Sequence, residues 1–436
     1  MPRPPRIPVR RPPVVKSATT QSPEVAKLLQ EGLALHRQGR LNDARQIYEK
    51  ILQKQTNHFD ALQLLATIYT QVKQHEVSLQ YFDKALQINK SNAAVFNNRG
   101  TALKELKRLD DALKSYDEAL RIKPDYADAT WNKSLLLILT ENYIDGWMLY
   151  EARLEKDDTK KNYPSYPQLV WRGQENIQGK KILIHSEQGL GDTIQFVRYL
   201  EQVHQLGSEI ILEVPKTLSK LISTIKTPIT VVDKGGNLPE FDAYCPLLSL
   251  PYVFKTTVET IPSSVPYLFA DKQKVNEWES RLGQKTRKRI GLVWSGSTGH
   301  KNDHNRSIQL EVFDELLKLP FEWHSLQKEY RTEDKKCLDS HPEVKQHQDE
   351  LDDFTDTAAL IECMDLVISV DTSVAHLAGA LGKSTWILLP FIPDYRWMLD
   401  REDCPWYPTA ELLRQDESRD WNKVIASLVS RLKSIN

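Results

Sequence analysis

The sequence predicts a multidomain protein, in which an all-α solenoid of helical repeats is followed by an α/β region of two Rossmann-like lobes. Three observations support this fold class. Small and aromatic residues recur with a period of 34 between about positions 25 and 126. From position 179 onward, short apolar segments alternate with helical patterns. A polar, charged stretch at 271–288 divides these segments into two groups.

The composition excludes several classes of function. The chain has 436 residues, of which 40% are hydrophobic, so more than one packed core is expected. A formal net charge of −1 argues against nucleic acid as a partner of the whole protein. The four cysteines, Cys245, Cys337, Cys363 and Cys404, lack the spacing of a zinc ribbon or a disulfide scaffold. We expect a cytoplasmic protein with no membrane span and no export signal.

The first 22 residues predict a disordered tail. They contain six prolines up to Pro13 and five arginines or lysines up to Lys16, a composition that favours extended chain. The tail is expected to be a solvated arm. The alternative is a docking segment for an acidic surface or a proline-recognising domain.

Helical repeats are predicted over residues 23–156. The period of 34 appears at three sets of positions: Tyr48, Phe82 and Tyr116; Ala44, Ser78 and Ala112; Gly32, Ala66 and Gly100. This is the period of the tetratricopeptide repeat. Repeats are expected at 25–58, 59–92 and 93–126, with a degenerate fourth repeat at 127–156. Its aromatic residues, including Trp147 and Tyr150, predict a cap that docks on the next region.

A short solenoid of this kind has a concave groove that binds extended peptides or partner helices, so we expect a protein or peptide partner there. The alternatives are a rigid spacer and a dimerisation arm. Candidate groove residues are polar side chains on the first helices of the repeats, which could equally form a solvated face: Asn97, Asn98, Lys104, Asn132 and Lys133.

The α/β region is expected to begin after a linker at 157–178. An N-terminal lobe is predicted at 179–270 and a C-terminal lobe at 289–436, joined by the connection 271–288. Expected strands are 181–186, 209–214, 229–233, 243–248, 290–295, 322–327, 366–370 and 385–389. Strands separated by helices predict parallel sheets, whose ligands bind beyond the carboxyl ends of the strands. The last helix, near 421–436, is expected to brace the first lobe.

Three loops at those carboxyl ends carry candidate site residues. In the first, Gly189 and Gly191 are expected to permit a tight turn and to place Asp192 at the start of a helix. Asp192 is therefore either an N-cap, a general base in the cleft, or both.

The second loop is polar throughout. Lys301, Asn302, His304, Asn305 and Arg306 lie within six residues, and such cations and amides suit a diphosphate and sugar hydroxyls. A solvated hairpin is the alternative. His300 and His304 lack a third ligand at helical spacing, so no metal site is expected.

The third loop joins the strand 366–370 to a helix rich in small residues. Asp371 or Thr372 is expected to cap this helix, and the free N–H groups of Thr372, Ser373 and Val374 would attract a phosphate. One turn further on, His376 is expected either to bond a phosphate or to pack.

The motifs GLGD, HKNDHNRSI and SVDTSVAHLAGALGKSTWILLPF resemble those of the heptosyltransferase-type glycosyltransferases, family nine, which have the GT-B fold. The run from Gly146 through PDYRWMLDREDCPWYP is similar to bacterial proteins that join tetratricopeptide repeats to such a domain. The resemblance implies an inverting transfer of a sugar from a nucleotide diphosphate sugar, without a metal or another cofactor.

The resemblance also assigns roles to residues. Asp192 matches the candidate base, and the donor pyrophosphate would lie at Asp371, Thr372, Ser373 and Val374. Lys301 and Arg306 would stabilise the departing nucleoside diphosphate. The sequence departs from the family at Ser373 and Val374, where glycine and leucine are more frequent. The acceptor is open between a protein, a polysaccharide and a lipid-linked glycan, and the alternative function is a catalytically inactive scaffold for protein interactions.

Overall fold

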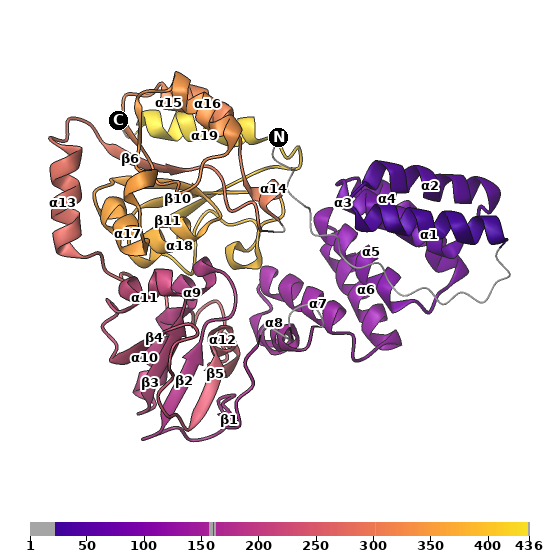
Figure 1. Ribbon diagram of the computed structural model, residues 1–436, viewed down its shortest axis with the longest axis horizontal. Coiled ribbons are helices and arrows are strands. Elements are labelled where there is room, and N and C mark those ends of the chain that lie inside the picture. The colour runs from indigo at the N-terminus through magenta and orange to yellow at the C-terminus, as the bar shows by residue number, and fades with distance from the viewer. Residues whose placement is uncertain (1–21, 157–159, 161–162, 301, 435–436) are drawn as a thin grey trace. The chain divides into compact units, whose positions relative to one another are not determined.

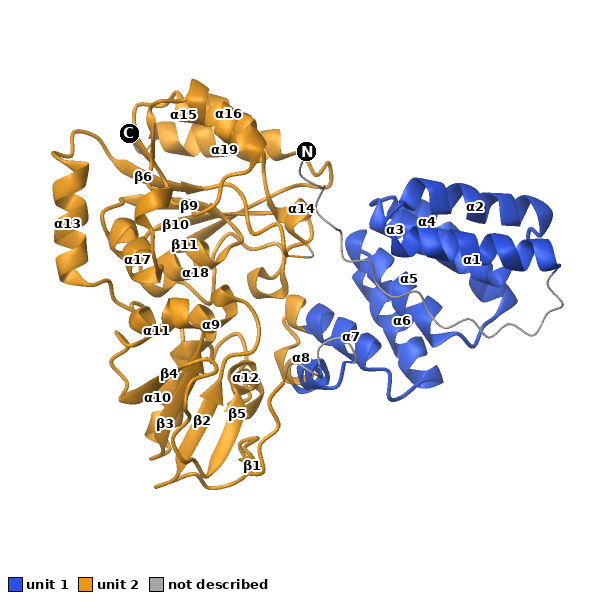
Figure 2. Cartoon of the chain, in the orientation of Figure 1, with its two compact units in different colours: residues 1–137, 148–160 blue, residues 138–147, 161–436 orange. Residues whose placement is uncertain are grey.

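The computed structural model describes residues 22–156, 160, 163–300 and 302–434 (Figure 1). It divides into two compact units, Met1–Leu137 with Met148–Lys160, and Ile138–Trp147 with Lys161–Asn436 (Figure 2). Of the predicted tail, residues 1–21 lie outside the described residues. Ser22 is the N-cap of the first helix, where its side chain accepts a hydrogen bond from the Val25 N–H.

The first unit is built of paired helices that follow the predicted repeats. They are α1 (Pro23–Arg37), α2 (Leu41–Lys54), α3 (Phe59–Gln71), α4 (His75–Ile88), α5 (Ala93–Glu105), α6 (Leu109–Ile122) and most of α7 (Ala127–Leu139). The small position of the repeat lies where two helices cross. A Cβ on Gly100 would lie 2.6 Å from Cε1 of Tyr116, and one on Gly32 would lie 2.5 Å from the same atom of Tyr48. The period of 34 therefore reflects close helix packing.

Polar contacts between repeats follow the same period. Asp83 accepts a hydrogen bond of 2.7 Å from Arg99, and Asp117 one of 2.6 Å from Lys133. Each pair joins the second helix of one repeat to the first helix of the next. Two predicted groove residues, Asn97 and Asn132, bond to each other at 2.8 Å.

The fourth repeat consists of α7 and α8 (Tyr143–Tyr150), followed by η1 (Glu151–Leu154). Residues 138–147 belong to the second unit, whereas 148–160 belong to the first. Trp147 is 1% exposed and packs edge to face against Phe196, Tyr395 and Trp406. These aromatic contacts explain why the end of this repeat departs from the consensus.

The N-terminal lobe contains a parallel sheet with the strand order β1-β5-β2-β3-β4. The strands are β1 (Leu169–Val170), β2 (Lys181–His185), β3 (Glu209–Val214), β4 (Ile229–Asp233) and β5 (Ala243–Pro246). The helical segments are α9 (Leu190–Phe196), η3 (Val197–Tyr199), α10 (Leu200–Gln205), α11 (Lys216–Ile222), η4 (Leu247–Ser249) and α12 (Leu250–Val253). The predicted linker 157–178 is corrected in part, because it supplies β1 and the buried Trp171.

The C-terminal lobe contains a second parallel sheet, with the order β11-β10-β9-β6-β7-β8. Its strands are β6 (Arg289–Val293), β7 (Glu322–Ser325), β8 (Val344–Gln346), β9 (Leu366–Val370), β10 (Thr385–Leu389) and β11 (Ala410–Arg414). Strands β8 and β11 were not predicted, since exposed polar residues interrupt both. The remaining elements are α13 (Lys272–Leu282), α14 (Asp303–Arg306), η5 (Leu310–Phe313), α15 (Asp314–Leu317), α16 (Thr332–Ser340), η6 (Gln348–Glu350), α17 (Phe354–Glu362), α18 (Ser373–Ala380), η7 (Tyr395–Trp397) and α19 (Trp421–Ser434).

The prediction that the last helix, α19, braces the first lobe is wrong. The helix lies beside α15 and α16 in the C-terminal lobe (Figure 1). Its apolar face joins the core of that lobe through Val424, Ile425, Leu428 and Leu432. The apolar spacing of this helix was clear from the sequence, but the surface that it covers was not.

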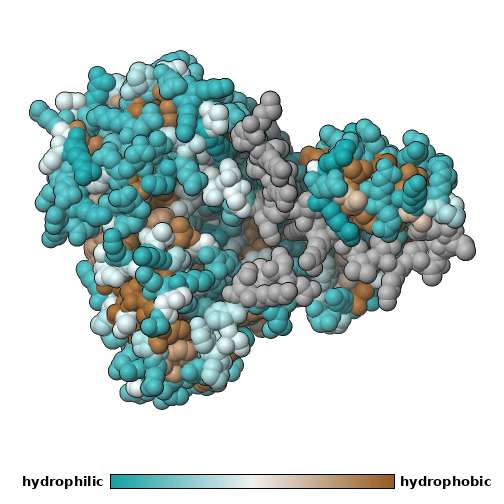
Figure 3. Space-filling model, in the orientation of Figure 1, coloured by the Kyte–Doolittle hydropathy of each residue, from teal (hydrophilic) through white to brown (hydrophobic). Residues whose placement is uncertain are grey.

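Several contacts join the two lobes. Lys220 of α11 pairs with Asp353 before α17 at 2.9 Å, and the Tyr267 N–H donates to the Ala380 carbonyl at 3.0 Å. The face drawn in Figure 3 is mostly hydrophilic over the C-terminal lobe, with hydrophobic patches over the N-terminal lobe. Within the described residues, no helix combines the length and the apolar character needed to cross a membrane.

Candidate functional site

The candidate site lies where α9 of the N-terminal lobe meets α18 of the C-terminal lobe. A Cβ on Gly191 would lie 2.8 Å from Cδ2 of His376 and 3.4 Å from Cα of Ser373. The predicted tight turn is corrected, because Gly189 is extended (φ −72°, ψ 167°) and Gly191 is already helical. Gly191 therefore serves the close approach of two helices rather than a turn.

Asp192 lies in the first turn of α9, but it is not the N-cap. Gly189 is the N-cap, and its N–H donates to Oδ2 of Asp192 at 2.7 Å, which is half of a capping box. Oδ1 of Asp192 accepts a hydrogen bond from Nη2 of Arg396. The side chains of Arg396 and Asp192 are 9% and 15% exposed. The base candidate is thus part of an interlobe ion pair.

Arg396, in η7, was missed by the sequence reasoning. Its Nε donates to Oε1 of Gln195 at 2.6 Å and its Nη1 to Oδ1 of Asp394 at 2.7 Å. Its guanidinium also lies 4.4 Å from the centre of the Tyr395 ring. The residue stands in the run PDYRWMLDREDCPWYP, but nothing in that run indicates its partner.

Arg306 and Asp371 are brought together on the C-terminal lobe. Nη1 of Arg306 donates to the Asp371 carbonyl at 2.7 Å. Nε of Arg306 is buried, with no hydrogen-bond partner among the described residues, and lies 3.7 Å from Oδ1 of Asp303. Gly296 makes room for the guanidinium, since a Cβ there would lie 2.5 Å from Nη2. Burial raises the pKa of the Asp371 carboxyl, and Arg306 opposes that rise.

Either Asp371 or Thr372 was predicted to cap α18. Thr372 is the N-cap residue, but its side chain accepts no hydrogen bond from the helix N–H groups. Its Oγ1 lies 3.2 Å from Oγ of Ser369 instead, and the described residues contain no side-chain cap on this end of the helix. The first N–H groups of α18, including those of Ser373 and Val374, therefore receive no hydrogen bond from a capping side chain.

His376 packs, which was one of its two predicted roles. It is 4% exposed, its Nδ1 lies 2.9 Å from the Tyr407 hydroxyl, and its ring stacks on Trp397. Burial lowers the pKa of His376 to about 3, with smaller effects from Arg198 and Arg306. A neutral, enclosed imidazole is a poor phosphate ligand, so this part of the prediction is not supported by the geometry.

Two other predicted residues add little. Lys301 lies outside the described residues. Asn305 is partly buried in α14, where its N–H donates to the Asn302 carbonyl at 3.1 Å.

Arg198 in η3 is a buried cation that the sequence reasoning missed. Its Nη2 donates to the Tyr267 hydroxyl at 3.0 Å. Its guanidinium is 4.6 Å from the ring centres of both Tyr267 and Tyr407. The signal was an arginine inside the apolar stretch QFVRYL.

One cluster away from the two helix ends has the residue types of a metal site. Potential ligand atoms of Asp314, Cys337 and His341 lie within 4.8 Å of one another. Both ring nitrogens of His341 are bonded to carboxylates, Asp314 at 2.8 Å and Glu343 at 2.7 Å. Burial lowers the pKa of His341, but these hydrogen bonds outweigh it and raise the pKa. The cluster is therefore satisfied as an ion-paired imidazolium.

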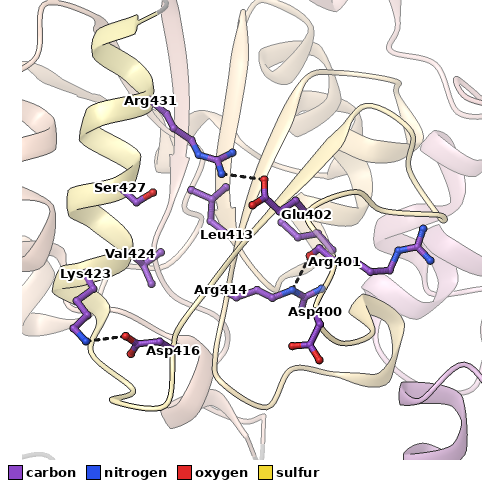
Figure 4. A pocket seen from close by; sticks show the side chains of 11 residues that line it. Asp400, Arg401, Glu402, Leu413, Arg414, Asp416, Lys423, Val424, Ser427 and Arg431 are labelled. Carbon is purple, nitrogen blue, oxygen red and sulfur yellow. Dashed lines mark hydrogen bonds and ion pairs between the residues drawn. The ribbon is translucent and has the colours of Figure 1, made fainter.

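A pocket of about 370 Å³ lies elsewhere on the C-terminal lobe, between the end of β11 and α19 (Figure 4). Two ion pairs lie among its lining residues, Arg431 with Glu402 at 3.2 Å and Lys423 with Asp416 at 2.7 Å. The predicted site residues do not line it. We therefore place the candidate site at α9 and α18 rather than in this pocket.

Comparisons with known proteins identify the repeats. Models of the tetratricopeptide repeat match residues 29–94 and 93–126. The N-terminal region therefore consists of tetratricopeptide repeats, as predicted, and repeats of this kind mediate protein interactions. These matches do not extend to the α/β region.

A curated relative is Protein FlbA from Caulobacter vibrioides. It is 22% identical over 399 residues, a match that covers 85% of this chain and 66% of FlbA. The chain thus spans slightly less than two thirds of the length of this relative. The match is too long to be confined to the repeats, so it reaches into the α/β region.

Among solved structures, the crystal structure of MamA is 21% identical, with a TM-score of 0.29, and covers 32% of this chain and 81% of that one. The first TPR of Spaghetti (RPAP3), bound to the HSP90 peptide SRMEEVD, is 22% identical, with a TM-score of 0.26. The match covers 28% of this chain and 95% of that one. YrrB, a TPR protein with an unusual peptide-binding site, is 20% identical, with a TM-score of 0.27. The match covers 30% of this chain and 68% of that one.

Proposed function

We propose that this protein is a metal-independent, inverting glycosyltransferase that moves a sugar from a nucleotide diphosphate sugar to an acceptor hydroxyl. One observation carries the proposal. Asp192 lies at the N-terminal end of α9, in the segment that follows strand β2 of one parallel sheet. Arg306 lies beside the N-terminal end of α18, in the segment that follows strand β6 of the other sheet, so both residues follow the carboxyl ends of parallel strands. Ligands of parallel α/β folds bind at such ends.

The donor diphosphate would lie at the start of α18. The uncapped N–H groups of Ser373 and Val374 supply hydrogen-bond donors at the positive end of a helix. Arg306 supplies a cation whose Nε has no hydrogen-bond partner within the described part of the chain. Charge-assisted hydrogen bonds of this type contribute about 1.5–3 kcal/mol each. The sugar hydroxyls would meet Asn305. Lys301, which lies outside the described residues, is proposed to join Arg306 in stabilising the diphosphate.

In the reaction, Asp192 accepts the proton of the acceptor hydroxyl as that oxygen attacks the anomeric carbon. The bond from the anomeric carbon to the diphosphate oxygen breaks, and the nucleoside diphosphate leaves with the electron pair. Arg306 and the N–H groups of α18 stabilise the charge that develops on it, an effect that lowers the barrier because these donors are already oriented. Attack opposite the leaving group inverts the anomeric centre.

The repeats would recruit a protein, either as the acceptor or as a partner enzyme. Asn98 and Lys104 on the first helix of the third repeat were predicted for this recognition. In the first case the repeats would hold the acceptor polypeptide, and in the second they would hold an enzyme that shares the glycan acceptor.

A second candidate function is an inactive scaffold that binds proteins through its repeats. The observation that favours it is the state of Asp192, both of whose carboxylate oxygens are already engaged, by Gly189 and by Arg396. In such a scaffold, Asp192 and Arg396 would form a structural ion pair with no catalytic role.

Calorimetric titration with a panel of nucleoside diphosphates and their sugars, without added metal, distinguishes the two functions. We expect one nucleotide to bind, and Arg306→Gln to weaken that binding at least tenfold. Arg401→Gln, on an arginine paired with Asp403 outside the site, is the matched control and should bind normally. Absence of binding by every nucleotide would favour the scaffold.

A further inference from the structure

We infer that Arg396 is a positioning residue for the base Asp192, and that the base is completed only when the two lobes meet. This inference rests on the proposed function and deepens it. Asp192 belongs to the N-terminal lobe, whereas Arg396 follows β10 of the C-terminal lobe, 204 residues later in the chain. The contact therefore depends on tertiary structure alone.

The geometry fixes both partners. Asp192 is held on one oxygen by the Gly189 N–H, so only its other oxygen turns toward Arg396. Arg396 is held on its remaining nitrogens by Gln195 and Asp394. Gln195 lies one turn after Asp192 on α9, so the guanidinium contacts the same helix twice. A planar group with several fixed donors can define the orientation of a carboxylate in this way.

The surrounding charges make Arg396 the direct partner of the base. The charged or titratable groups nearby are Asp394 before η7, His376 on α18, Asp371 at the end of β9, Arg306 on α14 and Arg198 on η3. His376 is neutral, Arg306 bonds to the Asp371 carbonyl, and Arg198 is enclosed by aromatic rings. Among these charged groups, Arg396 is the one whose side chain donates a hydrogen bond to the Asp192 carboxylate.

Two consequences follow for catalysis. A cation bonded to a carboxylate favours its ionised form, so Arg396 keeps the base deprotonated and ready to accept a proton. The same contact aims the carboxylate, so its loss should affect turnover more than donor binding. A purely structural tie between the lobes would leave the acid limb of kcat/KM in place, because turnover would then not depend on the protonation of Asp192.

The test uses the full-length protein and the donor sugar whose nucleotide binds in the calorimetric panel. Release of nucleoside diphosphate is measured against pH without an acceptor, so that water takes the sugar. We expect Arg396→Gln to move the acid limb of kcat/KM to higher pH and to lower kcat at least tenfold, with KM for the donor unchanged. Arg396→Lys should keep the acid limb close to the wild-type position, because it keeps the charge.

The matched control for this test is Arg401→Gln. Arg401 lies in the same segment between β10 and β11, but its guanidinium pairs with Asp403 at 2.6 Å and not with the base. The variant removes one arginine charge from that segment, as Arg396→Gln does. We therefore expect it to leave both the acid limb and kcat at their wild-type values, and an equal shift in the two variants would contradict a direct role for Arg396.

An acid limb that is identical in the wild type and in Arg396→Gln would overturn the inference. Carboxyl-carbon NMR of labelled aspartate, assigned with Asp192→Asn, provides a second measurement that needs no turnover. The Asp192 signal should titrate at higher pH in Arg396→Gln than in the wild type, and an unchanged titration would overturn the inference. A wild type that binds and hydrolyses no donor would instead contradict the proposed function.

Discussion

Gly191 on α9 lies directly against His376 on α18, where any side chain would overlap the imidazole at 2.8 Å. This contact between a helix of one lobe and a helix of the other sets the distance between the two helix N-termini that carry Asp192 and Ser373. The enclosed imidazole cannot move aside easily, because it is bonded to Tyr407 and stacked on Trp397.

Gly191→Ala should therefore destabilise the protein by about 1–3 kcal/mol, the usual cost of overpacking a tight contact. It should also weaken binding of any nucleotide found in the calorimetric panel. Urea unfolding measures the first effect. Gly299→Ala is the control, since a Cβ there meets only the Ser297 hydroxyl at 3.6 Å, and an equal loss in both variants would contradict the argument.

Trp147 should be the most costly aromatic residue of the fourth repeat to remove. It is almost fully buried against Phe196, Tyr395 and Trp406. Trp147→Ala should cost about 3–5 kcal/mol, as is usual for large aromatic side chains in cores. Ile144→Ala on the same helix is the control, because Ile144 is 52% exposed. Similar unfolding midpoints for the two variants would show that Trp147 does not anchor the repeat.

The interlobe pair of Lys220 and Asp353 should make stability depend on pH in the acid range. Burial raises the pKa of Asp353, but hydrogen bonds from Thr355 and Lys220 outweigh it and lower the pKa to about 2. Because the folded pKa lies below the unfolded value of about 3.9, the contribution is complete above that value and is lost as the pH falls toward 2.

Asp353→Asn tests this dependence, since asparagine can still cap α17 without a charge. The difference in free energy of unfolding between the wild type and this variant should be constant above about pH 4 and should shrink below it. Urea titrations at several pH values measure the difference. A difference that is independent of pH down to the acid transition would contradict the assignment.

The strands of both sheets could be predicted where they are continuous apolar runs, such as β9 and β10, because both faces are buried. Strand β1 has two residues and β8 has three, so neither carries a pattern long enough to recognise. For the site, the sequence indicated which loops carry polar side chains, but it did not indicate which side chains meet across the two lobes. Arg396 was missed because its role depends on a partner 204 residues away, which local sequence does not encode.

Packing rather than charge should hold the repeats together, and Tyr116 and Asp117 allow the comparison at adjacent positions. Tyr116 is buried against Gly100, whereas Asp117 is 56% exposed in its pair with Lys133. Tyr116→Ala should cost about 3–5 kcal/mol, the range for large aromatic core residues. Asp117→Asn should cost less than about 1 kcal/mol, since exposed ion pairs contribute little. Urea unfolding followed by helical circular dichroism measures both. If Asp117→Asn cost as much as Tyr116→Ala, the ion pairs that recur with the period of 34 would have to be part of what stabilises the solenoid.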